Sequence, residues 1–245
     1  MYYSEYDKRV LPVILVAMIL VSVALGLALR RKSLKIRAIP TAFIAAFMVF
    51  IEIIKLRWNI LGEMNYFYFP VHYCSLFAIV FPLAELFGER MSRIFRPVAA
   101  SMAFVVSVGM YICPQGMLGN ATEVFGQYFY RTHSLIFHHL LVLYVLLVWA
   151  LQLCKPRVRD TLLVGAFGVF YVSYAIPIAN KLETNFGNFL WSEIPFVEEL
   201  RLNIGQTKYT VLIVAAYTVG IMIGALLYIG VSKIGTIRLG KKNKK

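Results

Sequence analysis

The sequence predicts an all-α, polytopic membrane protein with seven transmembrane helices, an external N-terminus and a cytoplasmic C-terminus. The 245 residues are 60% hydrophobic, and the mean hydropathy is +0.72. Only 15% of the residues are charged, whereas soluble domains carry about 25%. Apolar runs of the roughly 20 residues needed to cross a hydrocarbon core recur along the chain. Basic residues gather in alternate connections between these runs.

We expect one transmembrane domain over residues 1–245, which ends in a basic tail at 233–245. The first apolar run follows a charged segment and lacks a small-residue cleavage site, so it predicts a signal anchor rather than a cleaved signal peptide. The predicted spans are about 10–29, 38–56, 66–87, 95–114, 133–154, 160–180 and 209–232.

The distribution of charge predicts the orientation. Most of the 25 Lys and Arg residues lie in or beside alternate connections, at about 30–37, 90–96, 155–159 and 233–245. The positive-inside rule places these segments in the cytoplasm. The long connections at about 115–132 and 181–208 are then external.

The net charge of +13 would suggest nucleic acid as the partner of a soluble protein. Because the basic residues lie in short loops and in the tail, they favour contacts with anionic lipid headgroups instead. No nucleic-acid partner is expected. We expect a multi-pass protein of the cell (cytoplasmic) membrane whose partners are membrane phospholipids, and the sequence gives no indication of oligomeric state.

Several polar side chains fall at one predicted depth, in the outer leaflet. They come from the ends of the second, third and fifth spans, which all meet the external face. Ionisable groups are costly in hydrocarbon, so each is a functional candidate. The members of this polar layer are Glu52, Lys55, His72, Cys74, Ser75, His133, His138 and His139, so that all four His residues of the chain fall in it.

Cys74 is the candidate nucleophile of this layer. In a Cys–His pair the imidazole takes the thiol proton, and the thiolate attacks an acyl carbon. Residues i and i+2 of a regular helix point about 200° apart, so His72 is not the expected base. His138 or His139 is, and because they point about 100° apart, only one of them would serve. His72 would stabilise an oxyanion or orient a headgroup.

Each candidate also has a plainer interpretation. Cys74 can be a small hydrophobic residue, or can pair with Cys113 in a disulfide. Glu52 can orient a histidine or hold a cation, or can neutralise Lys55 as a structural i, i+3 pair. His133 is predicted to be an interfacial residue. A metal site is disfavoured because no two histidines are spaced i, i+4 on one helix, and no cofactor is expected.

Two aromatic clusters flank the polar layer, at residues 66–69 and 125–130. Tyr, Trp and Phe at such positions are typical of the belts at membrane–water interfaces. The same side chains can also form the walls of a groove for lipid.

Three short motifs resemble those of the YwaF-like family of bacterial integral membrane proteins. Pro70-Val-His-Tyr-Cys-Ser75 resembles the family's Pro-Leu-His-Leu-Cys signature, with departures at the two variable positions. Phe137-His-His-Leu-Leu141 is similar to its later His-bearing helix. Glu183-Thr-Asn-Phe-Gly-Asn-Phe-Leu190 resembles its Thr-Asn-Phe external loop. The match extends from about residue 40 to residue 230.

That family is related to a eukaryotic membrane acyltransferase that moves fatty acyl chains between phospholipids. The resemblance implies a Cys nucleophile at Cys74 and a His partner at His138 or His139, because the doublet admits two alignments.

The hypothesis is therefore an intramembrane acyltransferase with its site in the outer leaflet. Asn185 and Asn188 of the external loop would bind the headgroup. The alternative is a non-catalytic lipid or small-molecule transporter or binding protein. A retinal protein is disfavoured, because no Lys lies between Tyr209 and Val231 to form a Schiff base.

Overall fold

The structure is a computed structural model that describes residues 4–62, 64–118, 121–123, 125–192 and 195–240. The described part is helical and contains no strand. Two 3-10 turns, η1 (Tyr66–Tyr68) and η2 (Tyr73–Leu76), separate α3 from α4. The helices are α1 (Glu5–Leu29), α2 (Leu34–Arg37), α3 (Ile39–Leu61), α4 (Phe77–Glu85), α5 (Glu89–Ile112), α6 (Pro114–Leu118), α7 (Phe129–Ala150), α8 (Asp160–Leu182), α9 (Pro195–Ile204) and α10 (Gln206–Gly240).

Six helices of the described part are long and apolar enough to cross a membrane: α1, α3, α5, α7, α8 and α10. An all-helical, multi-pass membrane protein is therefore confirmed. The predicted count of seven full-length spans is not reached.

The prediction of a continuous helix over about 66–87 is wrong. Its regular apolar part runs only from Tyr73 to Glu85. Pro70 has no backbone N–H and disfavours helical geometry at the residue before it. Phe69 is accordingly extended, at φ −65° and ψ 153°, and so is His72, at φ −67° and ψ 150°. The helix therefore starts at Tyr73, in the middle of the predicted polar layer.

α5 is the central helix of the bundle and packs against α4, α7, α8 and α10. The segment from Arg96 to Ala103 is buried at every position, because helices surround it on all sides. Its Ala and Ser residues let the neighbouring backbones approach closely, as is typical of helix interfaces in membranes. Gly224 of α10 serves the same purpose, since a Cβ there would lie only 2.3 Å from a Val105 methyl.

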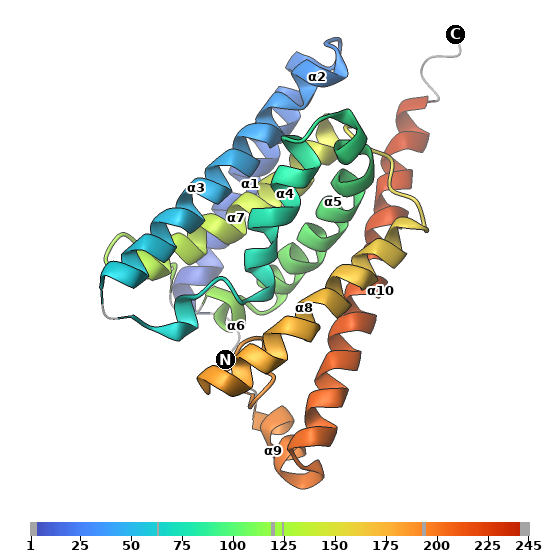
Figure 1. Cartoon of the computed structure of the whole chain (residues 1–245). Coiled ribbons are helices and arrows are strands. Elements are labelled where there is room, and N and C mark those ends of the chain that lie inside the picture. Colours follow the sequence, from blue (N-terminus) through green and yellow to red (C-terminus); the bar gives the residue numbers. More distant parts are fainter. Residues whose placement is uncertain (1–3, 63, 119–120, 124, 193–194, 241–245) are drawn as a thin grey trace.

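The remaining helices build outward from α5. α1 packs against α7, and α3 packs against α4 and α7. α8 and α10 form a hairpin that projects from the others, with α9 between them at its far end (Figure 1). α2 and the end of α10 lie at one end of the bundle, and α9 lies at the other (Figure 1). Which end faces the cytoplasm stays a prediction from the charge pattern.

Two sets of polar contacts hold the beginning of the N-terminal helix. A capping box between Ser4 and Asp7 begins α1. Asp7 is also fully buried, and Thr122 donates a 2.6 Å hydrogen bond to its carboxylate. This bond joins α1 to the connection between α6 and α7.

Candidate functional site

Glu52 of α3 is the hub of the polar layer. Lys55 Nζ lies 2.5 Å from its Oε1, and Ser75 Oγ donates to the same oxygen over 3.2 Å. His133 Nε2 of α7 lies 3.3 Å from Oε2, but the angle of this contact does not meet hydrogen-bond geometry. All four side chains are buried. Three elements, α3, η2 and α7, therefore meet at one carboxylate.

The structure brings part of the predicted layer together at this hub. The pairing of Glu52 with Lys55 and its meeting with Ser75 follow from the expected depth. His133 was placed at the interface by a span that began at residue 133. α7 in fact begins at Phe129, and four extra residues move His133 about 6 Å inward. The aromatic residues before it, in the run from Phe125 to Tyr130, were the signal that the helix starts earlier.

The two adjacent histidines of α7 are buried and hold one tautomer. His138 Nδ1 lies 2.8 Å from the Ser134 carbonyl, and His139 Nδ1 lies 2.7 Å from the Leu135 carbonyl. A carbonyl oxygen can only accept, so each Nδ1 carries the proton and each neutral ring keeps a lone pair on Nε2. His139 Nε2 has no hydrogen-bond partner. Both rings therefore have the electronic form of a base.

Cys74 lies in η2, in the first turn of the helical segment that continues into α4. Its thiol is partly buried and packs against the main core. Within the described part of the chain, no hydrogen bond joins its sulfur to His138 or His139. The catalytic pair therefore stays a prediction. The alternative of a disulfide with Cys113 is wrong, because Cys74, Cys113 and Cys154 are all free thiols.

His72 precedes the helical turn, and its hydrogen bond and ring contacts are made with residues outside the Glu52 hub. Its Nε2 donates a 2.8 Å hydrogen bond to the Phe67 carbonyl, so its neutral ring keeps an acceptor at Nδ1. The ring lies edge-on to Phe67 and to Phe186 of the loop after α8, at centroid distances of 4.8 and 5.2 Å. The angular argument for a regular helix does not apply to His72, because His72 lies outside the helix.

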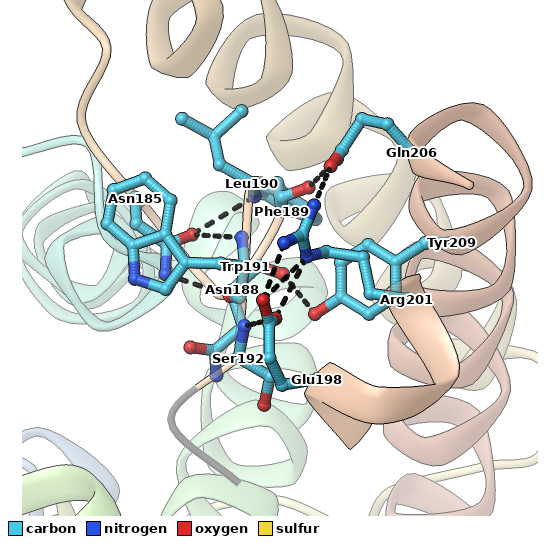
Figure 2. A network of polar contacts seen from close by, with 10 residues as sticks. All are labelled: Asn185, Asn188, Phe189, Leu190, Trp191, Ser192, Glu198, Arg201, Gln206 and Tyr209. Atoms are coloured by element: carbon cyan, nitrogen blue, oxygen red, sulfur yellow. Dashed lines mark hydrogen bonds and ion pairs between the residues drawn. The ribbon is translucent and has the colours of Figure 1, made fainter. Parts of the chain in front are cut away.

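The connection between α8 and α10 is an ordered loop with internal polar contacts (Figure 2). Asn185 Oδ1 accepts from the Leu190 amide over 3.1 Å, and Nδ2 donates to the Trp191 carbonyl over 2.9 Å. Asn188 has a left-handed backbone at φ 61°, and its carbonyl accepts from Tyr209. The Asn185 side chain is thus committed to the loop, and headgroup binding by the two asparagines stays a prediction.

A second set of contacts ties this loop to α9 and α10 (Figure 2). Arg201 donates to both carboxylate oxygens of Glu198, which also accepts from the Ser192 amide. The hydrogen bonds from Arg201 and the Ser192 amide lower the pKa of Glu198 from 4.5 to about 2. Gln206 Nε2 donates to the Phe189 carbonyl. These contacts hold the Phe186 and Phe189 rings in the bundle, where both are fully buried.

A buried ion pair at the opposite end of the bundle was not predicted. Arg96 donates two hydrogen bonds to Glu85, over 2.8 and 2.7 Å. Thr41 and Tyr144 donate to the two oxygens of the same carboxylate. Every acceptor of Glu85 is therefore used, and the network joins α3, α4, α5 and α7. Arg96 had been assigned to a basic loop, although it lies two turns inside α5.

The two aromatic clusters meet through one stacked pair. The rings of Tyr68 and Tyr130 are parallel within 2°, with centroids 3.6 Å apart. The C-terminal end of α3 lines an open groove of about 550 Å³, and none of the residues that line this groove belongs to the polar layer. Those residues are Ile54, Arg57, Trp58, Leu61 and Gly62.

No group of three or more His, Cys, Asp or Glu side chains in the described ranges could hold a metal ion. The imidazoles, the hydroxyl and the thiol of the polar layer can take part in proton transfer and nucleophilic attack.

A family sequence model, that of the TMEM164 family, matches residues 2–228. No curated protein and no solved structure matches the chain.

Proposed function

The chain belongs to the TMEM164 family, and from this premise we propose that it is an intramembrane acyltransferase of the cell membrane. It would move a fatty acyl chain from one membrane lipid to another through Cys74. The observation that carries the proposal is the buried Glu52 hub. This hub brings Lys55, Ser75 and His133 together beside the turn that holds Cys74.

The first step is the formation of a thioester. The Nε2 atom of an imidazole takes the Cys74 proton, and the thiolate attacks the carbonyl carbon of a lipid ester. The carbon–sulfur bond forms, the ester carbon–oxygen bond breaks, and the imidazolium returns the proton to the leaving hydroxyl. In the second step the hydroxyl of an acceptor lipid attacks the thioester in the reverse sense.

Burial opposes a negative charge on Cys74, and two features of its position counteract this effect. Cys74 lies at the start of the helical segment from Tyr73 to Glu85, where backbone N–H groups favour negative charge. The Lys55 ammonium of the hub also favours a thiolate at this position. Catalytic hydrogen bonds are often long without substrate and tighten when it binds. The proposal therefore requires the sulfur and an imidazole to close on each other in the lipid complex.

Three imidazoles are candidates for the base. His138 and His139 present an Nε2 lone pair, and His133 is the one that contacts the Glu52 carboxylate. An acidic partner orients an imidazole and stabilises its protonated form, as in a catalytic triad. This contact favours His133 as a third candidate beside the two that the resemblance implies.

Reconstituted proteoliposomes test the nucleophile. We expect Cys74→Ala to abolish transfer of a labelled acyl chain between phospholipids, while Cys113→Ala and Cys154→Ala transfer at the normal rate. Intact mass spectrometry should detect an acyl thioester on Cys74 in the wild type. Normal transfer by Cys74→Ala would refute the proposal.

Replacing each imidazole with Asn identifies the base. The variant of the true base should lose about 10²–10⁴-fold in rate. His133→Asn, His138→Asn and His139→Asn are compared at equal amounts of folded protein. Equal and full activity in all three would exclude an imidazole base.

The second candidate function is a non-catalytic lipid or small-molecule transporter or binder. The observation that favours it is the missing hydrogen bond between Cys74 and either predicted imidazole within the described part. The polar layer would then be a binding site. Saturable lipid movement in which Cys74→Ala is fully active, with no thioester formed, would support this function over the acyltransferase.

A further inference from the structure

Two buried phenol hydroxyls near Cys74 have no hydrogen-bond partner. They belong to Tyr73, which precedes Cys74 in the chain, and to Tyr171 of α8. A buried hydroxyl without a partner is destabilising, so native proteins contain few, and each calls for an explanation. Here both occur in the same aromatic cluster.

The two rings lie against each other, and one of them belongs to the residue before Cys74. Tyr171 is fully buried, and its ring meets that of Tyr73 edge-on at a centroid distance of 5.3 Å. Cys74 packs against the core cluster that contains both rings. A negative charge on Cys74 would act on the Tyr171 hydroxyl, so the two groups are near each other in space. The unused donors are therefore in the surroundings of the proposed nucleophile.

The loop after α8 covers the Tyr171 hydroxyl closely, and a glycine lies at the point of closest approach. Gly187 has a left-handed backbone at φ +61°, and a Cβ at this position would lie 2.8 Å from the Tyr171 oxygen. The same Cβ would lie 3.2 Å from the Phe189 ring. A glycine thus keeps side-chain atoms away from a buried, unpaired donor in an apolar environment.

The histidine nearest in sequence to Cys74 cannot supply this donor in its neutral form. The N–H of His72 is already bonded to the Phe67 carbonyl, and its other ring nitrogen is an acceptor. A phenol, in contrast, always carries a proton to donate near neutral pH. The phenols are therefore the donors in this part of the site whose hydrogen-bonding capacity is unused.

We propose that the Tyr171 hydroxyl, with the Tyr73 hydroxyl as its second member, donates hydrogen bonds to the oxyanion formed when Cys74 attacks a lipid ester. This inference rests on the proposed acyltransferase function. As the carbon–sulfur bond forms, the π electrons of the carbonyl move to its oxygen. The phenols bind that oxygen, and its electrons return when the ester carbon–oxygen bond breaks. Donors held in a dry site are effective in this role because they need no reorganisation.

Tyr171→Phe tests the inference in proteoliposomes. We expect kcat to fall about 10²–10³-fold with KM nearly unchanged, as when one oxyanion donor is removed. Tyr73→Phe should act in the same direction. The matched control is Tyr174→Phe on the same helix, whose hydroxyl is not among the buried unpaired atoms, and it should keep the normal rate. The Tm of Tyr171→Phe should equal or exceed that of the wild type, because an unpaired hydroxyl is lost.

A second readout separates transition-state stabilisation from positioning of the sulfur. Alkylation of Cys74 by iodoacetamide forms no oxyanion, so Tyr171→Phe should alkylate at the normal rate while it forms the acyl thioester slowly. Equal slowing of alkylation and acylation, or a normal acylation rate, would overturn the inference. If Cys74→Ala alone abolishes transfer in that case, the proposed function stands. If Cys74→Ala is active, the proposed function itself fails.

Discussion

His133 Nε2 lies 3.3 Å from Glu52 Oε2 and joins the N-terminal part of α7 to the C-terminal half of α3. The other oxygen of this carboxylate contacts Lys55 and Ser75. One acidic group therefore has partners on three elements, all away from water. Breaking a buried pair by removing one partner is costly because the remaining charge stays buried. Replacement of Glu52 should for this reason destabilise the protein.

Glu52→Gln should lower the free energy of unfolding by about 3–5 kcal/mol, because Lys55 would stay buried without an opposite charge. The double variant Glu52→Gln/Lys55→Met should recover most of this loss while transfer activity stays low. Thermal unfolding in detergent micelles, followed by circular dichroism, measures both. The control is Glu5→Gln, whose Lys8 partner is largely exposed and whose loss should cost less than about 1 kcal/mol. Equal losses of stability in Glu52→Gln and Glu5→Gln would contradict the role of Glu52 as the buried partner of Lys55.

The sequence predicted the Glu52 hub in part because depth can be counted along a helix. The count located Glu52, Lys55 and Ser75 at one level, where they meet. It placed His133 at the edge of this layer, as an interfacial residue, because the start of α7 lies at Phe129, and a misplaced helix start moves every side chain in depth. Hydropathy also could not reveal that residues 66–72 are not helical, since an apolar 3-10 turn and an apolar α-helix have the same composition.

The ion pair between Glu85 and Arg96 shows a different limit of sequence reasoning. The two residues are eleven positions apart, on either side of the turn between α4 and α5. A charge count assigns Arg96 to a solvated cytoplasmic loop. Only the antiparallel packing of α4 on α5 brings the guanidinium to the carboxylate. Such pairs depend on helix order in space, which a single sequence does not contain.

Removal of Arg96 should destabilise the protein more than it affects chemistry. Arg96→Met leaves Glu85 fully buried without its cation, so the free energy of unfolding should fall by about 3–5 kcal/mol. Activity per folded molecule should stay near normal, because the network lies at the end of the bundle opposite the Glu52 hub. The exposed pair of Lys35 with Glu89 is the control, and Lys35→Met should change stability by less than about 1 kcal/mol. A similar loss in both variants would mean that the buried pair contributes no more to stability than the exposed pair does.

The loop between α8 and α9 should keep its structure in mild acid. The pKa of Glu198 is lowered to about 2 by Arg201 and the Ser192 amide. A lowered pKa means that the stabilisation is complete above the ordinary value of 4.5 and is lost as the pH falls from there towards 2. Hydrogen exchange of residues 185–192 should therefore be unchanged by pH between 7 and 5, after correction for intrinsic rates. It should increase only below about pH 4.

Arg201→Met provides the matched test of this loop. Without the guanidinium the Glu198 pKa should return towards its ordinary value, so protection should be lost at a higher pH than in the wild type. Opening of the wild-type loop between pH 7 and 5 would contradict the assignment of Glu198 as its anchor.

Gly187→Ala should damage both the loop and the site beneath it. Alanine is strained by about 1–2 kcal/mol in the left-handed region, and its Cβ would also meet the Tyr171 oxygen at 2.8 Å. Gly126→Ala is the control, since Gly126 has a φ of +80° but no atom within 4 Å of an added Cβ. We expect Gly187→Ala to lower the Tm more than Gly126→Ala does.

The clash with Tyr171 can be isolated by a double-mutant cycle, because residues that contact each other do not contribute additively. Tyr171→Phe removes the oxygen that an alanine at position 187 would meet, so Gly187→Ala should cost less stability in the Tyr171→Phe background than in the wild type. The difference measures the contact between the loop and the hydroxyl. Additive losses would mean that backbone strain and the contact with the Phe189 ring account for the whole effect at Gly187, and that the loop does not cover the phenol.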